Sequence, residues 1–593
     1  MVNLYFTLLL REISYAMSQH LSEQELQRRE ALKSLRAMGI EPYPAAEYKA
    51  SHFSKDIRAS YENSPEAKEW EEVSISGRMM TQRINGKASF ADLMDSHGRV
   101  QVYFNRDILC PGEDKELYNT VFKRLLDIGD FIGITGRVFI TGMGEITVEA
   151  HRLTLLSKSL RPLPIVKKDK EGNIYDAFSN PEQRYRMRYV DLVVNEKVKN
   201  TFITRTRIMN AMREFFNRKD YLEVETPILQ PIPGGAAARP FITHHNALDI
   251  PLYLRVANEL YLKRLIVGGF EGVYEFSKDF RNEGMDRTHN PEFTVMEIYV
   301  AYKDYFWMMN FTEEMLEHVV TTVNKGSTEV MLGEKTLNFK APFARVTMVD
   351  AIIKYTGYDI TGMDEAALHD VCKALHIETN DSMGKGKLID EIFGEKCEGN
   401  YIQPTFIIDY PIEMSPLCKK HRDNPDFTER FELMINGKEV ANAYTELNDP
   451  IDQRERFEEQ LSLSAKGDDE AMFIDQDFLR ALEFGMPPTS GMGIGIDRLT
   501  MMLTNNTSIQ EVLFFPQMKP ENKEQKKVLE LNDGEKAIFK ILKEENRLAL
   551  DDLKTRAGLS NKAWDKSIKG LAKMGLTKVS KTEEGLFVEL TED

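Results

Sequence analysis

The sequence has little of what marks a membrane or secreted protein. No run approaches the roughly 18 consecutive apolar residues that a membrane-spanning helix needs. The apolar first ten residues have no basic segment before them and no small-residue cleavage site after them, which argues against a secretion signal. Because Met17 opens a more ordinary sequence, we interpret residues 1–16 as an extension or a mis-assigned start. No membrane partner is expected.

Cysteine is also scarce, and acidic residues outnumber basic ones. The cysteines lie far apart without a CxxC pair, so neither a disulfide framework nor a zinc site is expected, and a reducing cytoplasm fits. They are Cys110, Cys372, Cys397 and Cys418. The net charge of −17, taken alone, argues against binding to nucleic acid. A large enzyme needs only a local basic patch to hold phosphates, however, so the acidity does not exclude it.

The chain of 593 residues is too long for one hydrophobic core, and its pattern predicts several α+β domains. Residues 17–60 read as a helix and linker. Short β runs punctuated by glycine over residues 61–165 suit a small barrel such as an OB-fold. Residues 170–520 mix helices with long antiparallel strand signals and include a helical insertion at about 345–395. Residues 521–593 form a separate, lysine-rich region.

The first candidate site is the stretch FSKDFRNEGMDRTHNPEFTVMEIYVAY, residues 276–302. Two β-like runs flank a polar loop, Gly284 to Asn290, which predicts a long antiparallel hairpin. Because strand side chains alternate, Arg281 and Glu283 should share a face of the first strand. The second strand should present Phe293, Val295, Glu297 and Tyr299. A half-buried sheet face with an ion pair would explain any one of these residues, but not all of them in this order.

The second candidate site is FELMINGKEVANAYTEL, residues 431–447. Asn436-Gly437 is a strong signal for a two-residue hairpin turn, which places Met434 opposite Glu439. Glu432 and Glu439 then become diagonal neighbours whose charges repel unless a cation lies between them. The alternative is two solvated glutamates on an exposed hairpin.

These residues resemble a known family. FRNEG followed by RTHNPEFTVMEIY resembles motif 2 of the class II aminoacyl-tRNA synthetases. GMGIGIDRLTMML at 491–503 resembles motif 3, and FFNRKDYLEVETP, Phe215 to Pro227, resembles motif 1. GxGxG alone is weak evidence, since it matches neither a P-loop nor a dinucleotide fingerprint. The three motifs together are specific, and the resemblance extends from Ser18 to Pro520.

The resemblance implies an OB-fold anticodon-binding domain followed by a catalytic domain with an antiparallel sheet flanked by helices. It also implies a homodimer formed through motif 1. ATP would be held by Arg281, Glu283, Arg287, His289, Phe293, Gly493, Gly495 and Arg498. Arg281 and Arg498 would be catalytic, since the planar guanidinium binds phosphate oxygens bidentately. Glu432 and Glu439 would bind Mg²⁺.

Within the subgroup for lysine, aspartate and asparagine, the lysine enzymes are the best match. GGAAARPFITHHN at 234–246 resembles their specificity loop, and the pocket would contain Gly235, Glu259, Glu297, Tyr299, Asn442, Tyr444 and Glu446. An aspartate site would need a cation where this chain has Glu446. The implied function is activation of lysine with ATP to lysyl-adenylate and its transfer to the 3′ end of tRNA(Lys). The alternatives are an aspartyl- or asparaginyl-tRNA synthetase, or a non-catalytic tRNA-binding relative.

The second hairpin raises a geometric difficulty. In a regular strand, Asn442, Tyr444 and Glu446 face away from Glu439, although the resemblance places them beside the metal. We therefore expect a bulge or strong twist near Ala441.

In the predicted barrel, the resemblance implies that Phe90 stacks on an anticodon base. Arg78, Gln101 and Glu145 would read base edges. The alternative is that Phe90 belongs to the barrel core.

Beyond Asn532 the pattern predicts three helices and a hairpin, an order that looks like a winged-helix domain. Lys562, Lys566, Lys569 and Lys573 recur at helical spacing on the third helix. Trp564, Ile568, Leu571 and Ala572 should point towards a small core. The lysines are either a solvated face or an auxiliary contact to tRNA phosphates.

Overall fold

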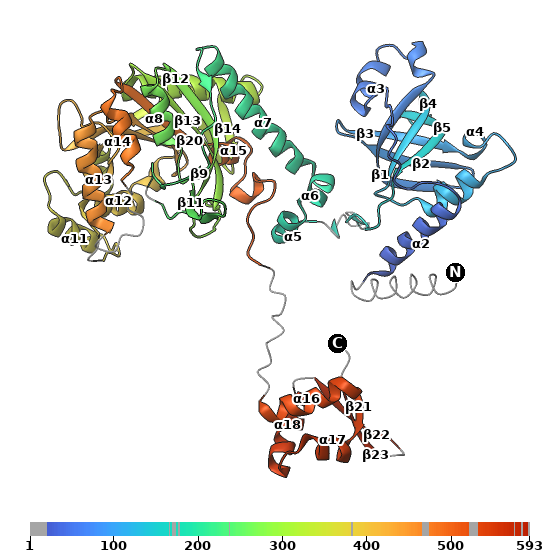
Figure 1. Cartoon of the computed structure of the whole chain (residues 1–593). Coiled ribbons are helices and arrows are strands. Elements are labelled where there is room, and N and C mark those ends of the chain that lie inside the picture. Colours follow the sequence, from blue (N-terminus) through green and yellow to red (C-terminus); the bar gives the residue numbers. More distant parts are fainter. Residues whose placement is uncertain are drawn as a thin grey trace. The chain divides into compact units, whose positions relative to one another are not determined.

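The computed structural model describes residues 21–164, 167–168, 174–175, 178–236, 238–380, 383–464, 474–520, 532–573, 576–582 and 585–590. The predicted extension at residues 1–16 lies outside them. The chain divides into two units, Met1–Gln517 and Met518–Asp593, which are described separately (Figure 1). Among the helices in the described ranges, none is long and apolar enough to cross a membrane.

The first described helix, α2 (Glu23–Ala37), starts at a capping box in which Ser22 and Glu25 satisfy each other's backbone N–H groups. It buries Ala31 and Leu35 and leaves Leu26 exposed. The helix α3 (Ser54–Tyr61) follows.

The next strands form a closed barrel in the order β1-β2-β3-β5-β4. Their bounds are β1 (Val73–Asn85), β2 (Ala88–Met94), β3 (Arg99–Asn105), β4 (Phe131–Ile140) and β5 (Ile146–Ser157). Alternate residues such as Val100, Val102 and Phe104 point into the barrel and are buried, as the two-residue period of a strand requires. The predicted OB-fold is confirmed. Between β3 and β4 lie α4 (Arg106–Leu109) and a π-helical segment, Leu117–Leu125.

An eight-stranded sheet forms the centre of the part of the first unit that follows the barrel, in the order β16-β17-β18-β19-β20-β13-β12-β8. The strands are β8 (Leu222–Glu223), β12 (Gly272–Phe280), β13 (Glu292–Ala301), β16 (Ala344–Thr347), β17 (Thr405–Pro411), β18 (Phe427–Met434), β19 (Glu439–Thr445) and β20 (Thr489–Gly495). All neighbours are antiparallel except the β16–β17 and β12–β8 pairs. The predicted antiparallel sheet flanked by helices is confirmed.

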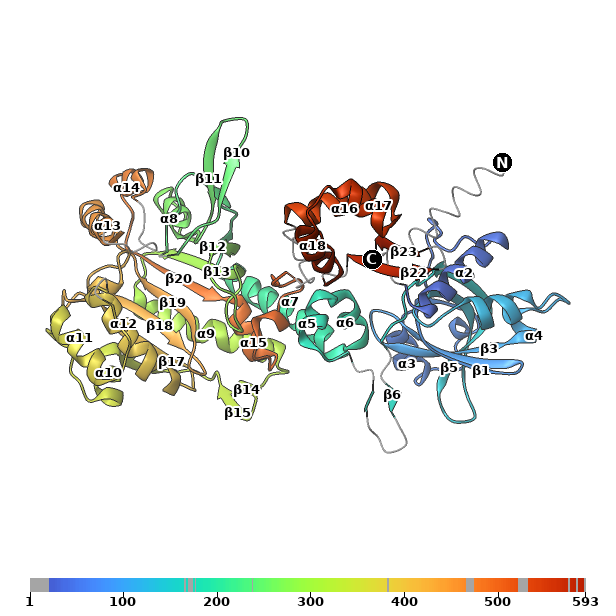
Figure 2. The ribbon, with the colours of Figure 1, turned by 90° about the horizontal axis from the view of Figure 1, so that it is seen from below.

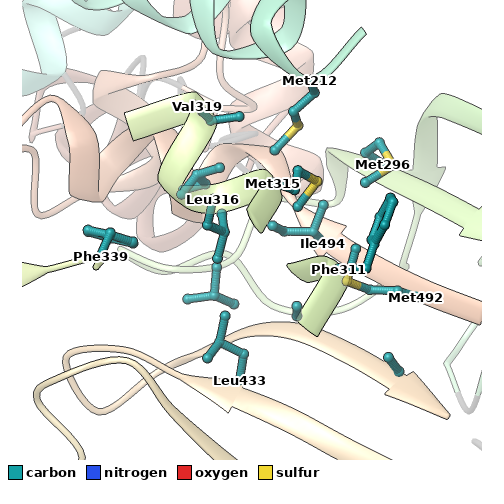
Figure 3. Packing of buried hydrophobic residues seen from close by; sticks show 14 of the residues in the cluster. Met212, Met296, Phe311, Met315, Leu316, Val319, Phe339, Leu433, Met492 and Ile494 are labelled. Carbon is teal, nitrogen blue, oxygen red and sulfur yellow. The ribbon is translucent and has the colours of Figure 1, made fainter. Parts of the chain in front are cut away.

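One face of this sheet packs on α7 (Glu196–Asn217) and α9 (Tyr305–Val323) and forms the largest core. Figure 3 shows Met315 and Leu316 of α9 among Met296, Met492 and Ile494 of the sheet. The other face carries α8 (Glu259–Val267), which packs on β12 and β13, and α14 (Gln476–Glu483), which packs on α8. The sheet therefore has a core face and an open face, on which α8 packs against β12 and β13.

Three helices, α10 (Met348–Thr356), α11 (Glu365–Ala374) and α12 (Lys385–Lys396), occupy the predicted insertion. They share a second core with Ile407 and Tyr410 of β17 and lie at the β16–β17 end of the sheet (Figure 2).

The remaining elements of the first unit are short or peripheral. The helices are α5 (Pro181–Arg186), α6 (Arg188–Val194), α13 (Pro450–Ser464) and α15 (Ile496–Leu503). The strands are β6 (Lys167–Lys168), β7 (Ile174–Tyr175), β9 (Leu229–Gln230), β10 (Ile242–His245), β11 (Ile250–Leu254), β14 (Glu329–Leu332) and β15 (Lys335–Asn338). Short 3₁₀ turns lie at Lys68–Trp70, Glu398–Asn400, Ile412–Met414 and Ile509–Glu511.

The second unit has the predicted three helices and hairpin, and also a short strand that was not predicted. Its elements are α16 (Asp533–Glu545), β21 (Arg547–Ala549), α17 (Leu550–Ala557), α18 (Asn561–Lys573), β22 (Thr577–Thr582) and β23 (Gly585–Leu590), with strand order β21-β23-β22. Trp564 and Leu571 are buried and Ile568 packs against them. Ala572 is exposed, so its predicted place in this core is wrong.

Candidate active site

The site lies on the open face of the sheet, where four strands are aligned in register. Glu297 of β13 is paired with Gly493 of β20, which is paired with Asn442 of β19, which is paired with Glu432 of β18. Two residues along, Tyr299, Gly491, Tyr444 and Arg430 form the next row. Because Met492 and Ile494 point into the core, the glycines of β20 face the site and leave a trough between the side chains of β13 and β19.

A bulge in β19 brings the second hairpin's residues onto this face. Leu433 is paired with Ala441 but Met434 with Glu439, so Val440 is the inserted residue. The bulge expected near Ala441 is present, and Met434 does lie opposite Glu439. With one residue inserted, Glu439 and Asn442 come to the same side of the strand.

At one end of the trough, Glu432 and Glu439 both bind arginines. Glu432 Oε1 lies 2.5 Å from Arg430 Nη2, and Glu439 Oε2 lies 3.2 Å from Arg498 Nη1. Burial, together with the negative charge of Glu439, raises the pKa of Glu432 to about 7 despite Arg430. The described residues contain no group of three or more acidic, histidine or cysteine side chains placed for a metal ion. A cation between these carboxylates would therefore take further ligands from a nucleotide or water.

Arg281 lies beside Phe293, with its Cζ 5.2 Å from the ring centroid. Its Nε is buried and has no hydrogen-bond partner among the described residues, so a donor is available to a ligand. The prediction that Arg281 and Glu283 share a strand face is wrong, because β12 ends at Phe280. Both residues lie in the loop between the strands, and Glu283 is exposed.

The loop between β12 and β13 is held by Asp286. Its carboxylate accepts hydrogen bonds from the backbone N–H groups of Thr288 and His289, and its Oδ2 lies 2.9 Å from His289 Nδ1. The carbonyl of Arg287 accepts a bond from the backbone N–H of Ile509. These contacts fix the backbone of the loop while both side chains, Arg287 and His289, stay exposed.

The other end of the trough is a buried cluster of charge. Lys263 Nζ lies 2.5 Å from Glu259 Oε1 and forms an ion pair with Glu446, and all three side chains are almost fully buried. Burial raises the pKa of Glu446 well above its usual range, although Lys263 opposes the shift. The Tyr299 hydroxyl donates to Glu297 Oε2 over 2.8 Å, and burial also raises the pKa of Glu297. A side chain on Gly491 would overlap Glu446 and Tyr299, so only glycine fits there.

Comparison with known proteins agrees with this geometry. Residues 180–519 match the family described as tRNA synthetases class II (D, K and N), and residues 73–156 match the OB-fold nucleic acid binding domain. A lysine–tRNA ligase of Christiangramia forsetii is 65% identical over 97% of this chain and 99% of its own length. A lysine–tRNA ligase of Porphyromonas gingivalis is 68% identical over 84% of this chain and 86% of its own. The one from Azobacteroides pseudotrichonymphae is 66% identical over 84% and 99%.

The chain is a class II tRNA synthetase.

The two rows of this synthetase bring together most of the residues that the sequence singled out. Glu297, Tyr299, Asn442, Tyr444 and Gly493 lie in them, with Glu259, Glu446 and Phe293 at their margins. A Cβ on Gly493 would come no closer than 3.6 Å to another residue, so the protein itself leaves that space free. Gly235 has a positive φ of 90° and lies against Ala257 and Glu259, at the start of α8.

Three residues of the synthetase site were missed from the sequence. Lys263 reads as an ordinary i, i+4 partner of Glu259, and that pattern is the same on an exposed helix. Arg430 occupies the strand position two before Glu432, so alternation alone could have placed it on the site face. Gly491, Gly493 and Gly495 alternate along one strand, and this alternation could have placed Gly491 on the site face with the other two.

In the barrel, Phe90 is half-buried on the outer surface, so the alternative that it belongs to the core is wrong. Its ring lies 5.1 Å from that of Tyr103. The single hydroxyl proton of the buried Thr147 is within reach of Gln101 Oε1 (3.0 Å) and of the carbonyl of Glu145 (3.1 Å), so these two residues are neighbours in the barrel. Arg78 lies apart from them, opposite Met94, and donates to the carbonyl of Gly129. Arg83 is the residue paired with Phe90.

Proposed function

We propose that this synthetase activates L-lysine with ATP to lysyl-adenylate and transfers the lysyl group to the 3′ end of tRNA(Lys). The observation that carries the choice of lysine is the buried pair of carboxylates, Glu259 and Glu446, at the end of the trough. Two buried acidic groups with one resident cation have a strong electrostatic preference for an ammonium ligand. The relatives named lysine–tRNA ligase support the same choice.

Activation requires attack of the lysine carboxylate on the α-phosphate of ATP, with pyrophosphate leaving. Such a reaction depends on positioning and on stabilising negative charge. Arg281 would bind the α-phosphate through its free donors, while its neighbour Phe293 stacks on adenine. Arg498, Arg287 and His289 would bind the other phosphates, and Glu283 would lie near the adenine amino group.

Glu432 and Glu439 fit a magnesium site. The charge of Glu439 helps to raise the pKa of Glu432, and the two carboxylates provide the hard oxygen ligands that Mg²⁺ prefers. When bound there, the ion would neutralise phosphate charge. Arg430 and Arg498 hold the two side chains in place. Asn442, in register with Glu432, would hold the amino acid beside the metal, with Tyr299, Tyr444 and Gly235 around it.

Aspartate is a poorer substrate for this geometry, because the buried Glu446 would repel its side-chain carboxylate. A non-catalytic relative would have lost part of the machinery, whereas Arg281, Glu432, Glu439 and Arg498 are all present. The test is ATP–pyrophosphate exchange with each of the three amino acids. Exchange with lysine alone is expected, and exchange with aspartate but not lysine would overturn the assignment.

We further propose a cytoplasmic homodimer formed through motif 1, residues 215–227. Large apolar side chains are exposed at and beyond this motif, and burying them against a second copy of the chain would be favourable. They are Leu222, Ile228, Leu229 and Ile232. Phe90, Gln101, Glu145 and Arg78 would read the anticodon. In the second unit, three exposed lysines on α18 would contact tRNA phosphates. They are Lys562, Lys566 and Lys569; the side chain of Lys573 lies outside the described ones.

A further inference from the structure

The most unexpected group in the proposed lysine pocket is a lysine of the protein itself. Lys263 is fully buried, one turn along α8 from Glu259. Its ammonium contacts both pocket carboxylates, Glu259 and Glu446. It also lies 5.5 Å from the ring of Tyr444 and 5.8 Å from that of Phe478, so aromatic faces surround its remaining sides.

If Lys263 acted only by repulsion, its positive charge would oppose binding of the substrate ammonium. The sum of the formal charges in the cluster leads to a different expectation. Glu259, Glu446 and Lys263 together carry one net negative charge, which one substrate ammonium cancels. Without Lys263, two like charges would face each other in a dry site, and such a pair takes up a proton instead of remaining fully ionised.

The hydrogen bonding of Glu446 supports this count. Both carboxylate oxygens of Glu446 are buried, and neither has a hydrogen bond of regular geometry in the described part of the chain, although the ammonium of Lys263 lies against Oε2. An acceptor that is buried and unpaired favours a ligand donor. The ammonium of Lys263 therefore holds one oxygen of the carboxylate, and the other oxygen has acceptor capacity for a substrate ammonium.

We propose that Lys263 is a positioning residue that offsets the formal charge of one of the two carboxylates, Glu259 and Glu446, and fixes both for a single substrate ammonium. This proposal rests on the proposed function. It predicts that the effect of Lys263 on lysine binding depends on how many carboxylates face it.

The test is a set of full-length variants assayed by ATP–pyrophosphate exchange. Lys263→Met keeps the length of the side chain and removes its charge, and should raise the lysine KM at least tenfold while leaving the ATP KM within twofold. Glu259→Gln leaves a neutral Lys263–Glu446 pair and should also raise the lysine KM. The double variant combines Lys263→Met with Glu259→Gln, and its formal charge returns to minus one through Glu446. Its lysine KM should therefore be at least fivefold lower than that of Glu259→Gln alone.

Lys263→Met should thus raise the lysine KM of the unmodified protein but lower that of Glu259→Gln. This reversal distinguishes charge balance from a merely structural role, since the loss of a structural contact would make the double variant worse than either single one. If Lys263→Met does not fold, the comparison of Glu259→Gln with the double variant decides the question. A matched control is Arg264→Met, which removes the ion pair from the next residue of α8 to Asp475 and should leave the lysine KM unchanged.

The proposal is overturned if the double variant has a lysine KM equal to or higher than that of Glu259→Gln. A different result would refute the proposed pocket instead: Glu259→Gln and Glu446→Gln would both leave the lysine KM unchanged.

Discussion

Replacing Glu446 by glutamine tests the proposed lysine pocket most directly. The substitution keeps the shape of the side chain and removes one negative charge. Glu446 is 1% exposed, lies against Gly491 and Tyr299, and contacts Lys263. In the Glu446→Gln variant the remaining charges of Glu259 and Lys263 sum to zero, so a substrate ammonium would enter a dry pocket without a counter-charge.

Breaking one side of a buried ion pair costs about 3–5 kcal/mol. The lower value applies here, because the amide oxygen of glutamine still accepts a hydrogen bond and Glu259 remains. About 3 kcal/mol corresponds to roughly a 100-fold loss of affinity, since each 1.4 kcal/mol is tenfold. We therefore expect the lysine KM to rise about 100-fold. The ATP KM should change little, because Arg281 and Phe293 lie at the other end of the trough.

The assay is lysine-dependent ATP–pyrophosphate exchange at several ATP concentrations. A matched control is Glu429→Gln on β18, a buried carboxylate that binds Arg422 and Thr445 instead of the pocket. It should lower the thermal stability without changing the lysine KM. If Glu446→Gln has the lysine KM and kcat of the unmodified protein, Glu446 is not part of the pocket and the electrostatic reasoning fails.

Three other predictions concern the rest of the molecule. The double variant Glu432→Gln, Glu439→Gln should need at least tenfold more Mg²⁺ for pyrophosphate exchange, while circular dichroism shows that the fold is retained. An unchanged Mg²⁺ requirement would show that these residues do not form the metal site. Burial raises the pKa of Asp279 to about 7, although Arg255 opposes the shift. Between pH 5 and 7 the folded protein therefore holds a proton that the unfolded chain has released, so the free energy of unfolding falls as the pH rises. Asp279→Asn should abolish about 2–3 kcal/mol of that fall, which denaturant unfolding at pH 5 and 8 measures, and equal pH dependence in both proteins would contradict it. Changing three lysines of α18 to glutamine should raise the KM for tRNA(Lys) at low salt and flatten its salt dependence, with pyrophosphate exchange unaffected; aminoacylation kinetics unchanged at every salt concentration would leave these lysines as solvated surface. They are Lys562, Lys566 and Lys569.

The sequence predicted the parts of the fold and site that depend on local periodicity. Alternation along β13 placed Glu297 and Tyr299 on one face, and the Asn436-Gly437 turn set the pairing of Met434 with Glu439. The bulge in β19 followed because a regular strand could not bring both sets of residues to one site. The end of β12 at Phe280 was missed, since FRNEG continues the alternating pattern after strand pairing has stopped.

Lys263 could not have been placed from the sequence, and the reason is physical. A Glu–Lys pair four residues apart is favourable on any helix surface, and the pattern carries no information on burial. What buries Lys263 is the approach of Glu446, Tyr444 and Phe478, which are distant in the chain and reach α8 only once the sheet has formed. Long-range packing thus turns a common surface pair into a fixed charge inside the pocket.

The arrangement of β20 links specificity to stability. Met492 and Ile494 fill the core on one face of this strand. On the other face Gly493 leaves the trough free, and Gly491 makes room for Glu446 and Tyr299. A shift of β20 by one residue would exchange the two faces, burying glycines in the core and filling the trough with large side chains. The core that α9 forms with the sheet (Figure 3) therefore fixes the register on which the pocket depends. Because α9 contacts both β19 and β20, its packing also keeps Tyr444 beside Gly491. The row of residues that leads to the proposed lysine pocket thus depends on apolar contacts on the opposite face of the sheet.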